Sequence, residues 1–146
     1  MEQFLICIKD TMKFMTFNSG VMYDTDFIIS LSFEDQSTHQ QAVSLQQKYK
    51  EHSQFIVLDI ITFELATTVS RLYNQKIAVE VTQKVLEIAD IVLELSFEDK
   101  QMIWSEFNSY NKKGISYFDC ANLVMAKKLN CRVGSFDKFY PKEVLA

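Results

Sequence analysis

Residues 22–31 read MYDTDFIISL and place two aspartates, Asp24 and Asp26, where a strongly apolar stretch comes to its end. The segment GVMYDT at residues 20–25 is predicted to be a buried strand, because apolar side chains occupy successive positions and therefore both faces. Carboxylates at the end of such a strand have three interpretations: a turn or cap, an aspartate that becomes phosphorylated, or part of a metal site. Each interpretation requires different partners elsewhere in the chain.

Length and composition predict one compact domain. The chain has 146 residues, of which 48% are hydrophobic and 13% aromatic, so it can bury one core but has little room for a second. One proline and three glycines leave little material for linkers. We expect a single domain over residues 20–146 and an N-terminal extension over residues 1–19, whose structure the sequence leaves open.

The cysteines and the N-terminus predict a cytoplasmic protein that does not associate with membranes. Three cysteines are an odd number and no C-x-x-C pair occurs, which argues against a disulfide framework and against a zinc site. The apolar run near the N-terminus is too short to span a bilayer, and no basic stretch precedes it as in a signal peptide.

Further apolar segments alternate with segments of helical periodicity. Such alternation, with strands that are apolar on both faces, predicts a three-layer α/β/α fold around a mainly parallel sheet of four or five strands. The helix at 37–51 is expected to be capped by Ser37, and Val81, Val85 and Ile88 are expected to point inward. The expected strands cover 20–25, 54–60, 90–96 and 131–137, and the expected helices cover 37–51, 62–75, 78–89, 97–111 and 115–130.

Four acidic residues are predicted to meet at one edge of this sheet. Asp24 and Asp137 lie at the carboxyl ends of the first and fourth strands, where open parallel sheets bind ligands. Glu64 and Asp119 each fall in the first turn of a predicted helix, and Ser116 precedes Asp119 with the spacing of a capping box. Taken singly, each acid also suits a cap or a turn.

Crowded carboxylates are costly unless a cation lies between them. No histidine cluster accompanies the four acids, and purely oxygen ligands suit Mg²⁺ or Mn²⁺ rather than zinc. Such a site can activate water for an in-line displacement at phosphorus.

The charge is distributed unevenly along the chain. The formal net charge is −4, yet residues 1–110 carry 8 basic against 16 acidic side chains, and residues 111–146 carry 7 against 3. The basic side chains of the second part have two interpretations: solvated surface, or contacts to a phosphodiester backbone.

Taken together, MYDTDFIISL, ITFELATTVSRL and ISYFDCANLVMAKKLNCRVGSFDKFY resemble the PIN-domain family of metal-dependent ribonucleases. Within that family they are similar to the toxins of prokaryotic VapBC-type toxin–antitoxin pairs. The family pattern is an apolar strand ending in D-T-N or D-T-D, a helical glutamate, a helical aspartate in a D-A-x-x-x-A-like context, and a T/S-x-D element after the last main strand. The resemblance covers about residues 20–140 and implies a PIN-like fold.

Carried over by position, the resemblance makes Asp24, Glu64 and Asp119 residues that hold or orient the metal. Ser135 and Asp137 match the T/S-x-D element, with Asp137 acting directly or through water. Ala126 stands at the recurring small position of the helix.

Asp26 departs from the family pattern, because asparagine is common at that position. We expect Asp26 and Ser135 to hold the loop or to hydrogen-bond the metal-binding carboxylates or the metal-bound water, and not to contact the ion themselves. The extension at residues 1–19 and the short C-terminus also depart from the pattern.

The resemblance further implies an endoribonuclease that uses one or two Mg²⁺ or Mn²⁺ ions, acts on RNA, forms a homodimer and is neutralised by an antitoxin protein. Four lysines are candidates for contacts to the RNA backbone: Lys112, Lys113, Lys127 and Lys138.

Three alternatives stay open. The chain could be a housekeeping PIN nuclease of RNA processing, or a PIN-like module that binds RNA or protein without cleaving. DTDFI also comes close to the D-x-D-x-[TV] signature of haloacid-dehalogenase-type phosphatases. That signature needs Thr or Val where Ile28 stands, and a later acid pair, whereas Asp137 is followed by Lys138 and Phe139.

Overall fold

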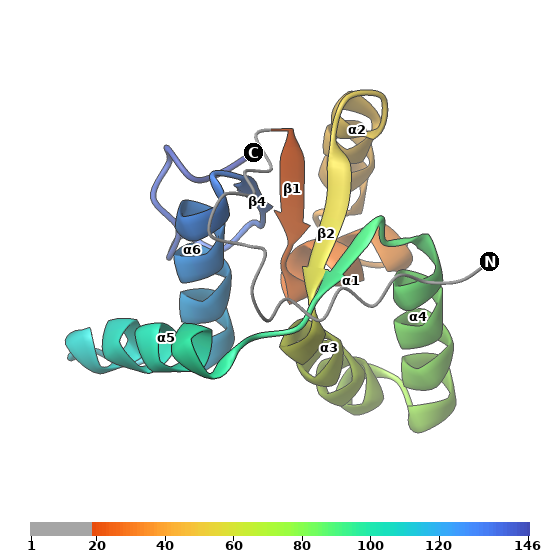
Figure 1. Cartoon of the computed structure of the whole chain (residues 1–146). Helices are drawn as coiled ribbons and strands as arrows, with labels where there is room; N and C mark the ends of the chain where they lie inside the picture. Colours follow the sequence, from red (N-terminus) through yellow and green to blue (C-terminus); the bar gives the residue numbers. More distant parts are fainter. Residues whose placement is uncertain (1–18) are drawn as a thin grey trace.

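A computed structural model describes residues 19–146 and places a four-stranded parallel sheet at the centre (Figure 1). The order of strands across the sheet is β3-β2-β1-β4, and all neighbouring pairs are parallel. Tyr23 at the end of β1 pairs with Gly134 at the end of β4, so these two strands end side by side. The strands are β1 (Gly20–Tyr23), β2 (Gln54–Leu58), β3 (Ile91–Leu93) and β4 (Arg132–Gly134).

Helices connect the strands in pairs. Because parallel crossovers are right-handed, the four helices that carry the chain from β1 through β2 to β3 lie on one face, and the pair that returns it to β4 lies on the other. The predicted three-layer α/β/α fold is therefore confirmed. The helices are α1 (Thr25–Ser32), α2 (His39–Lys50), α3 (Asp59–Leu72), α4 (Gln75–Ile88), α5 (Phe97–Ser109) and α6 (Tyr117–Leu129).

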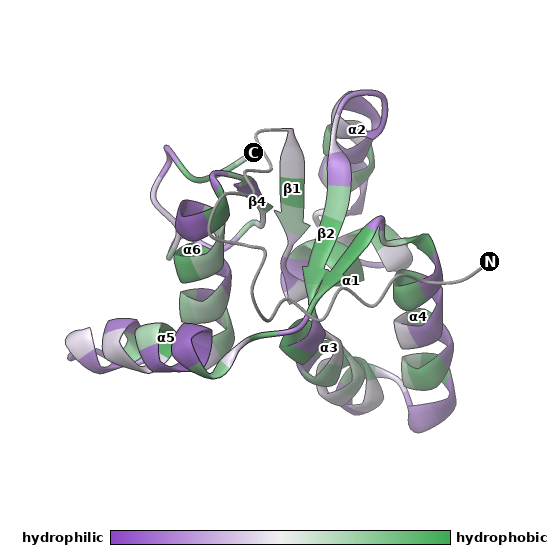
Figure 2. Ribbon diagram, viewed as in Figure 1, coloured by the Kyte–Doolittle hydropathy of each residue, from purple (hydrophilic) through white to green (hydrophobic). Residues whose placement is uncertain are grey.

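The core lies between the central strands and the helices that cover them. Met22 of β1 and Ile56 of β2 are fully buried, as is Phe27 of α1. Figure 2 shows the strands as largely hydrophobic, whereas polar residues gather on the outer helices. Burial of β1 and β2 on both faces explains why their sequences are continuous apolar runs instead of alternating ones.

The first helix is missing from the sequence-based prediction. Asp24 directly follows β1 and caps α1 by accepting a hydrogen bond from the backbone N–H of Thr25. Three consecutive side chains of this helix, Phe27, Ile28 and Ile29, are buried, so the apolar residues form a continuous run that does not show a helical period.

Three local predictions are wrong. Helix α2 starts at His39, so the residue at the cap position is Thr38 and not Ser37. The Thr38 hydroxyl makes no cap hydrogen bond and contacts the Ser30 hydroxyl instead. Helix α3 follows β2 without a loop, so Glu64 lies in its second turn and not in its first. Ile88, expected to point inward, is 48% exposed.

Helix α5 extends away from the sheet and packs chiefly on α6 (Figure 1). The first turn of α5 meets the last turn of α6 through Asp99 and Lys128, and these two consecutive helices are called the helical hairpin below. Among the described residues, no helix is both long and apolar enough to cross a bilayer. Apart from Ser19, the predicted N-terminal extension lies outside the residues that the structure describes, as does Cys7.

Candidate active site

Asp24 is the structural centre of the site. Its side chain is 3% exposed, and each carboxylate oxygen accepts two hydrogen bonds. Oδ1 accepts from the Thr25 N–H at 2.8 Å and from Asn122 Nδ2 at 3.0 Å. Oδ2 accepts from the hydroxyls of Tyr140 at 3.0 Å and Ser135 at 3.1 Å. Asp24 therefore joins α1, α6 and the segments that follow β4.

Glu64 and Asp119 approach the same place from two other helices. The Thr25 hydroxyl donates to Glu64 Oε2 and so links α1 to α3. Asp119 closes a capping box with Ser116 at the start of α6, as the sequence spacing predicts. The Tyr140 hydroxyl that bonds Asp24 also lies 3.5 Å from Asp119 Oδ1. One phenol therefore lies between two of the acids and can donate its single proton to either of them.

The turn after β4 brings Asp137 to the site and is held in place by Asp26 of α1. The Ser135 hydroxyl lies 3.0 Å from Asp26 Oδ1, and the Phe136 N–H donates to Asp26 Oδ2 at 2.9 Å. Asp26 therefore holds this turn. Asp137 is exposed, and its Oδ1 accepts from the Phe139 N–H at 2.8 Å.

These acids line one cavity of about 250 Å³ at the carboxyl edge of the sheet. Three of its walls come from the helices α1, α3 and α6, and the fourth comes from the turn after β4. The structure thus brings together the five acids that the sequence singled out. The lining residues are Asp24, Thr25, Asp26, Ile29, Glu64, Thr68, Ser116, Asp119 and Asp137.

Burial and mutual repulsion disfavour the charged forms of these acids. Burial raises the pKa of Asp24 to about 8, and the charges of Asp26 and Asp119 add to the rise. Burial likewise raises the pKa of Glu64, which the hydrogen bond from Thr25 partly offsets. Burial also raises the pKa of Asp26 and of Asp119. Among residues 19–146, no Lys, Arg or His forms an ion pair with any acid of the cavity.

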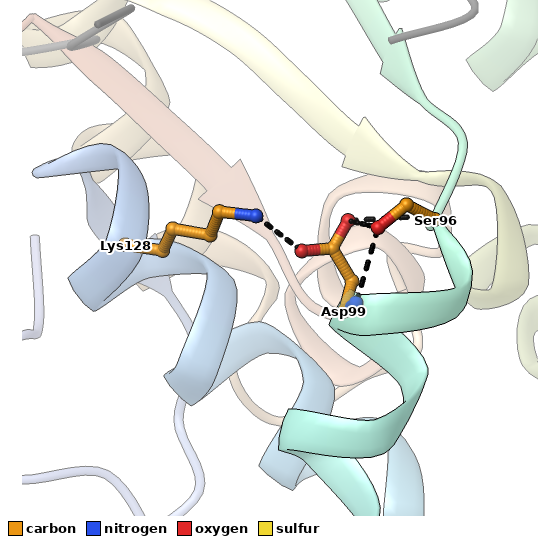
Figure 3. A network of polar contacts seen from close by, with 3 residues as sticks. All are labelled: Ser96, Asp99 and Lys128. Carbon is orange, nitrogen blue, oxygen red and sulfur yellow. Dashed lines mark hydrogen bonds and ion pairs between the residues drawn. The ribbon is translucent and has the colours of Figure 1, made fainter. Parts of the chain in front are cut away.

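Asp99 is a buried acid outside the cavity that does have a cationic partner, and it serves as a comparison for the cavity acids. It closes a capping box with Ser96 on α5, just as Asp119 does with Ser116 on α6. Figure 3 shows Lys128 of α6 reaching Asp99, with Nζ 2.5 Å from Oδ1. Burial would raise the pKa of Asp99, but the hydrogen bonds from Lys128 and Ser96 hold this pKa below its usual value. The cavity acids have no such partner in the described chain.

The donor chemistry of the cavity fits a divalent cation. Its charged groups are all carboxylates, the ligands that Mg²⁺ and Mn²⁺ prefer, and their raised pKa values mark them as lacking a cation. Within residues 19–146, no three Asp, Glu, His or Cys side chains are close enough together to form a ready-made metal site. The carboxylates would therefore have to draw closer when an ion binds.

The predicted lysines do not belong to the cavity. Lys112 and Lys113 are exposed in the loop between α5 and α6, and Lys138 is exposed beside Asp137. Lys127 lines a separate hollow between α5 and α6, together with Met102 and Glu106.

The sequence interpretation missed three residues that hold the acids in place. Asn122 lies one helical turn after Asp119, a spacing that puts both on one face of α6 and could have revealed it. Thr25 directly follows Asp24 and is part of the D-T-D sequence. Tyr140 arrives from the irregular C-terminal segment, and no local signal marks it. Burial and the charges of Asp24 and Asp119 raise the pKa of Tyr140 far above its usual value, so it remains a hydrogen-bond donor.

Two solved structures share this fold at low sequence identity. Mycobacterium tuberculosis VapC20, a sarcin-ricin loop cleaving toxin, superposes with a TM-score of 0.70 and 15% identity, over 82% of this chain and 91% of that one. VapBC2 from Rickettsia felis, solved bound to a DNA fragment from its promoter, gives a TM-score of 0.61 and 14% identity, over 86% and 92% of the two chains. No curated protein sequence gives a significant match.

The family comparison covers the same region as the cavity. The sequence model of the PIN domain matches residues 21–142, a range that includes every acid of the site and Tyr140. With the parallel sheet and the acids at its carboxyl edge, this match identifies the family. The chain belongs to the PIN domain family.

Proposed function

We propose that the protein is a divalent-metal-dependent endoribonuclease and the toxin of a prokaryotic toxin–antitoxin pair. The observation that carries the proposal is the cavity itself: acids from four parts of the chain meet at the ligand-binding edge of the sheet without a cationic side chain among the described residues. Membership of the PIN family and the fold shared with two toxin-system proteins support the same activity.

Each acid has a distinct part in this proposal. Asp24, Glu64 and Asp119 hold one or two Mg²⁺ or Mn²⁺ ions, and Asp137, which is more exposed, contributes directly or through water. Asp26 and Ser135 fix the turn after β4 and thereby set the position of Asp137. When bound, the metal offsets the carboxylate charge and activates water for attack on the phosphodiester.

Tyr140 and Asn122 keep Asp24 in a single orientation. Their donors occupy one position on each carboxylate oxygen, and the Thr25 N–H takes the second position on Oδ1. The second position on Oδ2 opens to a ligand when the Ser135 hydroxyl donates to Asp26, 3.0 Å away, instead of to Asp24.

Cleavage of a mixed RNA pool tests the activity. The wild-type protein with Mg²⁺ or Mn²⁺ should release fragments, excess chelator should stop cleavage, and added metal should restore it. Asp24→Asn should abolish cleavage while the far-ultraviolet circular dichroism stays native. Full activity in that variant, or cleavage that survives chelation, would refute the site assignment.

The toxin role is tested separately, by the effect of the protein on cell growth. Expression of the wild-type chain should arrest growth, and Asp24→Asn should relieve the arrest. Co-expression of the protein from the adjacent reading frame should also relieve it and should co-purify with this chain. Metal-dependent cleavage without growth arrest would instead support a housekeeping nuclease.

A further inference from the structure

Helix α3 carries a hydroxyl group in the cavity wall that the proposed mechanism does not use. Thr68 lines the acidic cavity and is half-buried. It lies one helical turn after Glu64, so the two side chains share the face of α3 that forms this wall. A polar side chain at this position is next to the place where a bound substrate would lie.

The other hydroxyl groups of α3 are bonded to the helix itself. Thr67 is exposed and donates to the carbonyl of Phe63, four residues earlier, a common hydrogen bond of threonine in helices. Thr62 and Ser70 likewise donate to backbone carbonyls of α3. The side chain of Thr68 forms no hydrogen bond with any residue of the described part of the chain. Its hydroxyl can therefore turn toward a ligand without breaking a bond of the fold.

Thr68 also differs from the other polar residues that line the cavity. The Thr25 hydroxyl donates to Glu64, and the Ser116 hydroxyl accepts from the backbone N–H of Asp119 at 3.0 Å. The remaining polar lining consists of carboxylates, which accept hydrogen bonds but cannot donate when charged. Among the lining residues, Thr68 alone has a hydroxyl that makes no hydrogen bond within residues 19–146.

The chemistry of this wall suits a sugar hydroxyl of the substrate. Carboxylates repel a phosphate oxygen except where a metal ion lies between them, whereas they do not repel a neutral hydroxyl. The ribose 2′-hydroxyl both donates and accepts, so it can pair with a threonine hydroxyl in either direction. Because water is the proposed nucleophile, the 2′-hydroxyl takes no part in bond breaking and is free for recognition.

We propose that Thr68 hydrogen-bonds the ribose 2′-hydroxyl of a nucleotide beside the phosphodiester to be cut, and thereby favours RNA over DNA of the same sequence. This inference rests on the proposed ribonuclease function and assigns a specificity-determining residue to that site. Side chains one helical turn apart are separated by about 5–6 Å, so a phosphate held near Glu64 places its own sugar within reach of Thr68. Thr68 contacts the substrate and does not touch the reacting phosphorus.

Replacing ribose by deoxyribose at single positions tests this contact. A short RNA that contains a cut made by the wild-type protein is synthesised with ribose throughout, and with one 2′-deoxynucleotide at each position flanking the cut in turn. With Mn²⁺, one of these substitutions should lower kcat/KM of the wild type about tenfold, which corresponds to about 1.4 kcal/mol for the lost hydrogen bond. Thr68→Val should show the same tenfold loss on the all-ribose strand. On that deoxy strand it should equal the wild type.

Two further variants separate recognition from a structural role. Thr67→Val is the matched control, because it makes the same change on the next residue, whose hydroxyl donates to its own helix, and it should cut every strand as the wild type does. Thr68→Ser keeps a hydroxyl and should retain the preference for ribose. Equal losses of Thr68→Val on ribose and deoxyribose strands, or no loss on either, would overturn the proposal. So would a wild type that is indifferent to every deoxy substitution.

A binding measurement distinguishes failure of this inference from failure of the proposed function. If the wild-type protein cuts no RNA, the nuclease proposal fails, and fluorescence anisotropy of labelled all-ribose and all-deoxy strands with Mn²⁺ still tests the contact. Tighter binding of the ribose strand that is lost in Thr68→Val supports the contact. Equal binding of the two strands, or a preference that Thr68→Val retains, overturns it.

Discussion

Asp24 shows how one residue can serve function at the expense of stability. It caps α1, receives four hydrogen bonds and is almost completely buried, yet it lies close to other acids. Buried charge without a cation is unfavourable, and the raised pKa of Asp24 reports that cost. The protein therefore retains at its centre a carboxylate that the metal-free fold would hold more easily as a neutral group.

The pKa of Asp24 predicts a pH-dependent loss of stability in the metal-free protein. Asp24 keeps its proton to about pH 8 when folded, and its unfolded value is near 3.8. The folded state therefore binds more protons between these values, and the free energy of unfolding falls as pH rises through this window. Asp24→Asn should remove the Asp24 share of this dependence and leave the smaller shares of Asp26, Glu64 and Asp119, whose pKa values are also raised. The variant should therefore raise the stability of metal-free protein by on the order of 2–4 kcal/mol more at about pH 8 than at about pH 5.

Urea unfolding with chelator present checks this prediction. Asparagine fits the site, because Oδ1 can still accept from Thr25 and Asn122 while the amide donates to the Ser135 or Tyr140 hydroxyl. Equal pH dependence in the two proteins would contradict the pKa argument.

The residue scale also shows a limit of sequence analysis. Ser96 with Asp99 and Ser116 with Asp119 have the same S-x-x-D spacing, and both form capping boxes. Only the tertiary contact with Lys128 distinguishes the structural acid from the one in the cavity. The order of the acids along the chain was the basis for selecting Asp24, Glu64, Asp119 and Asp137 as candidate site residues. The hydrogen-bond or ion-pair partner of each acid could not be predicted from the local sequence pattern.

At the scale of elements, the site depends on helices that start directly where strands end. β1 passes into α1 through Asp24 alone, and β2 passes into α3 without a loop. These direct strand-to-helix connections bring Asp24, Thr25 and Glu64 together at the sheet edge. The same connections explain two errors of the sequence-based prediction. Because no turn residues separate strand from helix, the boundary lies inside one apolar run, and neither α1 nor the start of α3 was predicted.

The hairpin of α5 and α6 predicts a measurable ion-pair effect. Lys128→Met should destabilise the protein by about 1–3 kcal/mol, because it leaves the buried Asp99 carboxylate without its cation. Since the Lys128 side chain is 34% exposed, solvent screening places the cost toward the lower end of this range.

A double-mutant cycle with Asp99→Asn measures this coupling by chemical unfolding. Lys127→Met on the next residue is the matched control and should be close to neutral, since Lys127 is exposed and forms no ion pair within residues 19–146. Additive effects of Lys128→Met and Asp99→Asn would show that the pair contributes nothing.

At the scale of the whole molecule, the alternation of strands and helices was predictable except for α1, and the long-range contacts of the site were not. Alternating apolar and helical segments determine the parallel sheet, and the parallel sheet determines the edge at which Asp24, Glu64, Asp119 and Asp137 meet. Tyr140, which ties the C-terminal segment to Asp24 and Asp119, depends on a long-range contact that no periodicity encodes.

The whole fold should respond to the metal. An ion that binds only the folded state raises stability, by about 2.7 kcal/mol at a concentration one hundred times its Kd. The thermal midpoint of the wild-type protein should therefore rise with Mn²⁺, and that of Asp99→Asn should rise similarly. Asp24→Asn should begin higher in chelator and gain little. A rise in Asp24→Asn equal to that of the wild type would place the ion elsewhere.

Cleavage by the two capping-box variants tests the central claim most directly. Asp119→Asn and Asp99→Asn make the same chemical change at the same helical position, but only Asp119 faces the cavity. With RNA and Mn²⁺, Asp119→Asn should lower kcat by about a hundredfold or more, whereas Asp99→Asn should cleave within about threefold of the wild type below its unfolding temperature. Equal loss in both variants, or none in Asp119→Asn, would contradict an acidic cavity that binds the metal and cuts RNA.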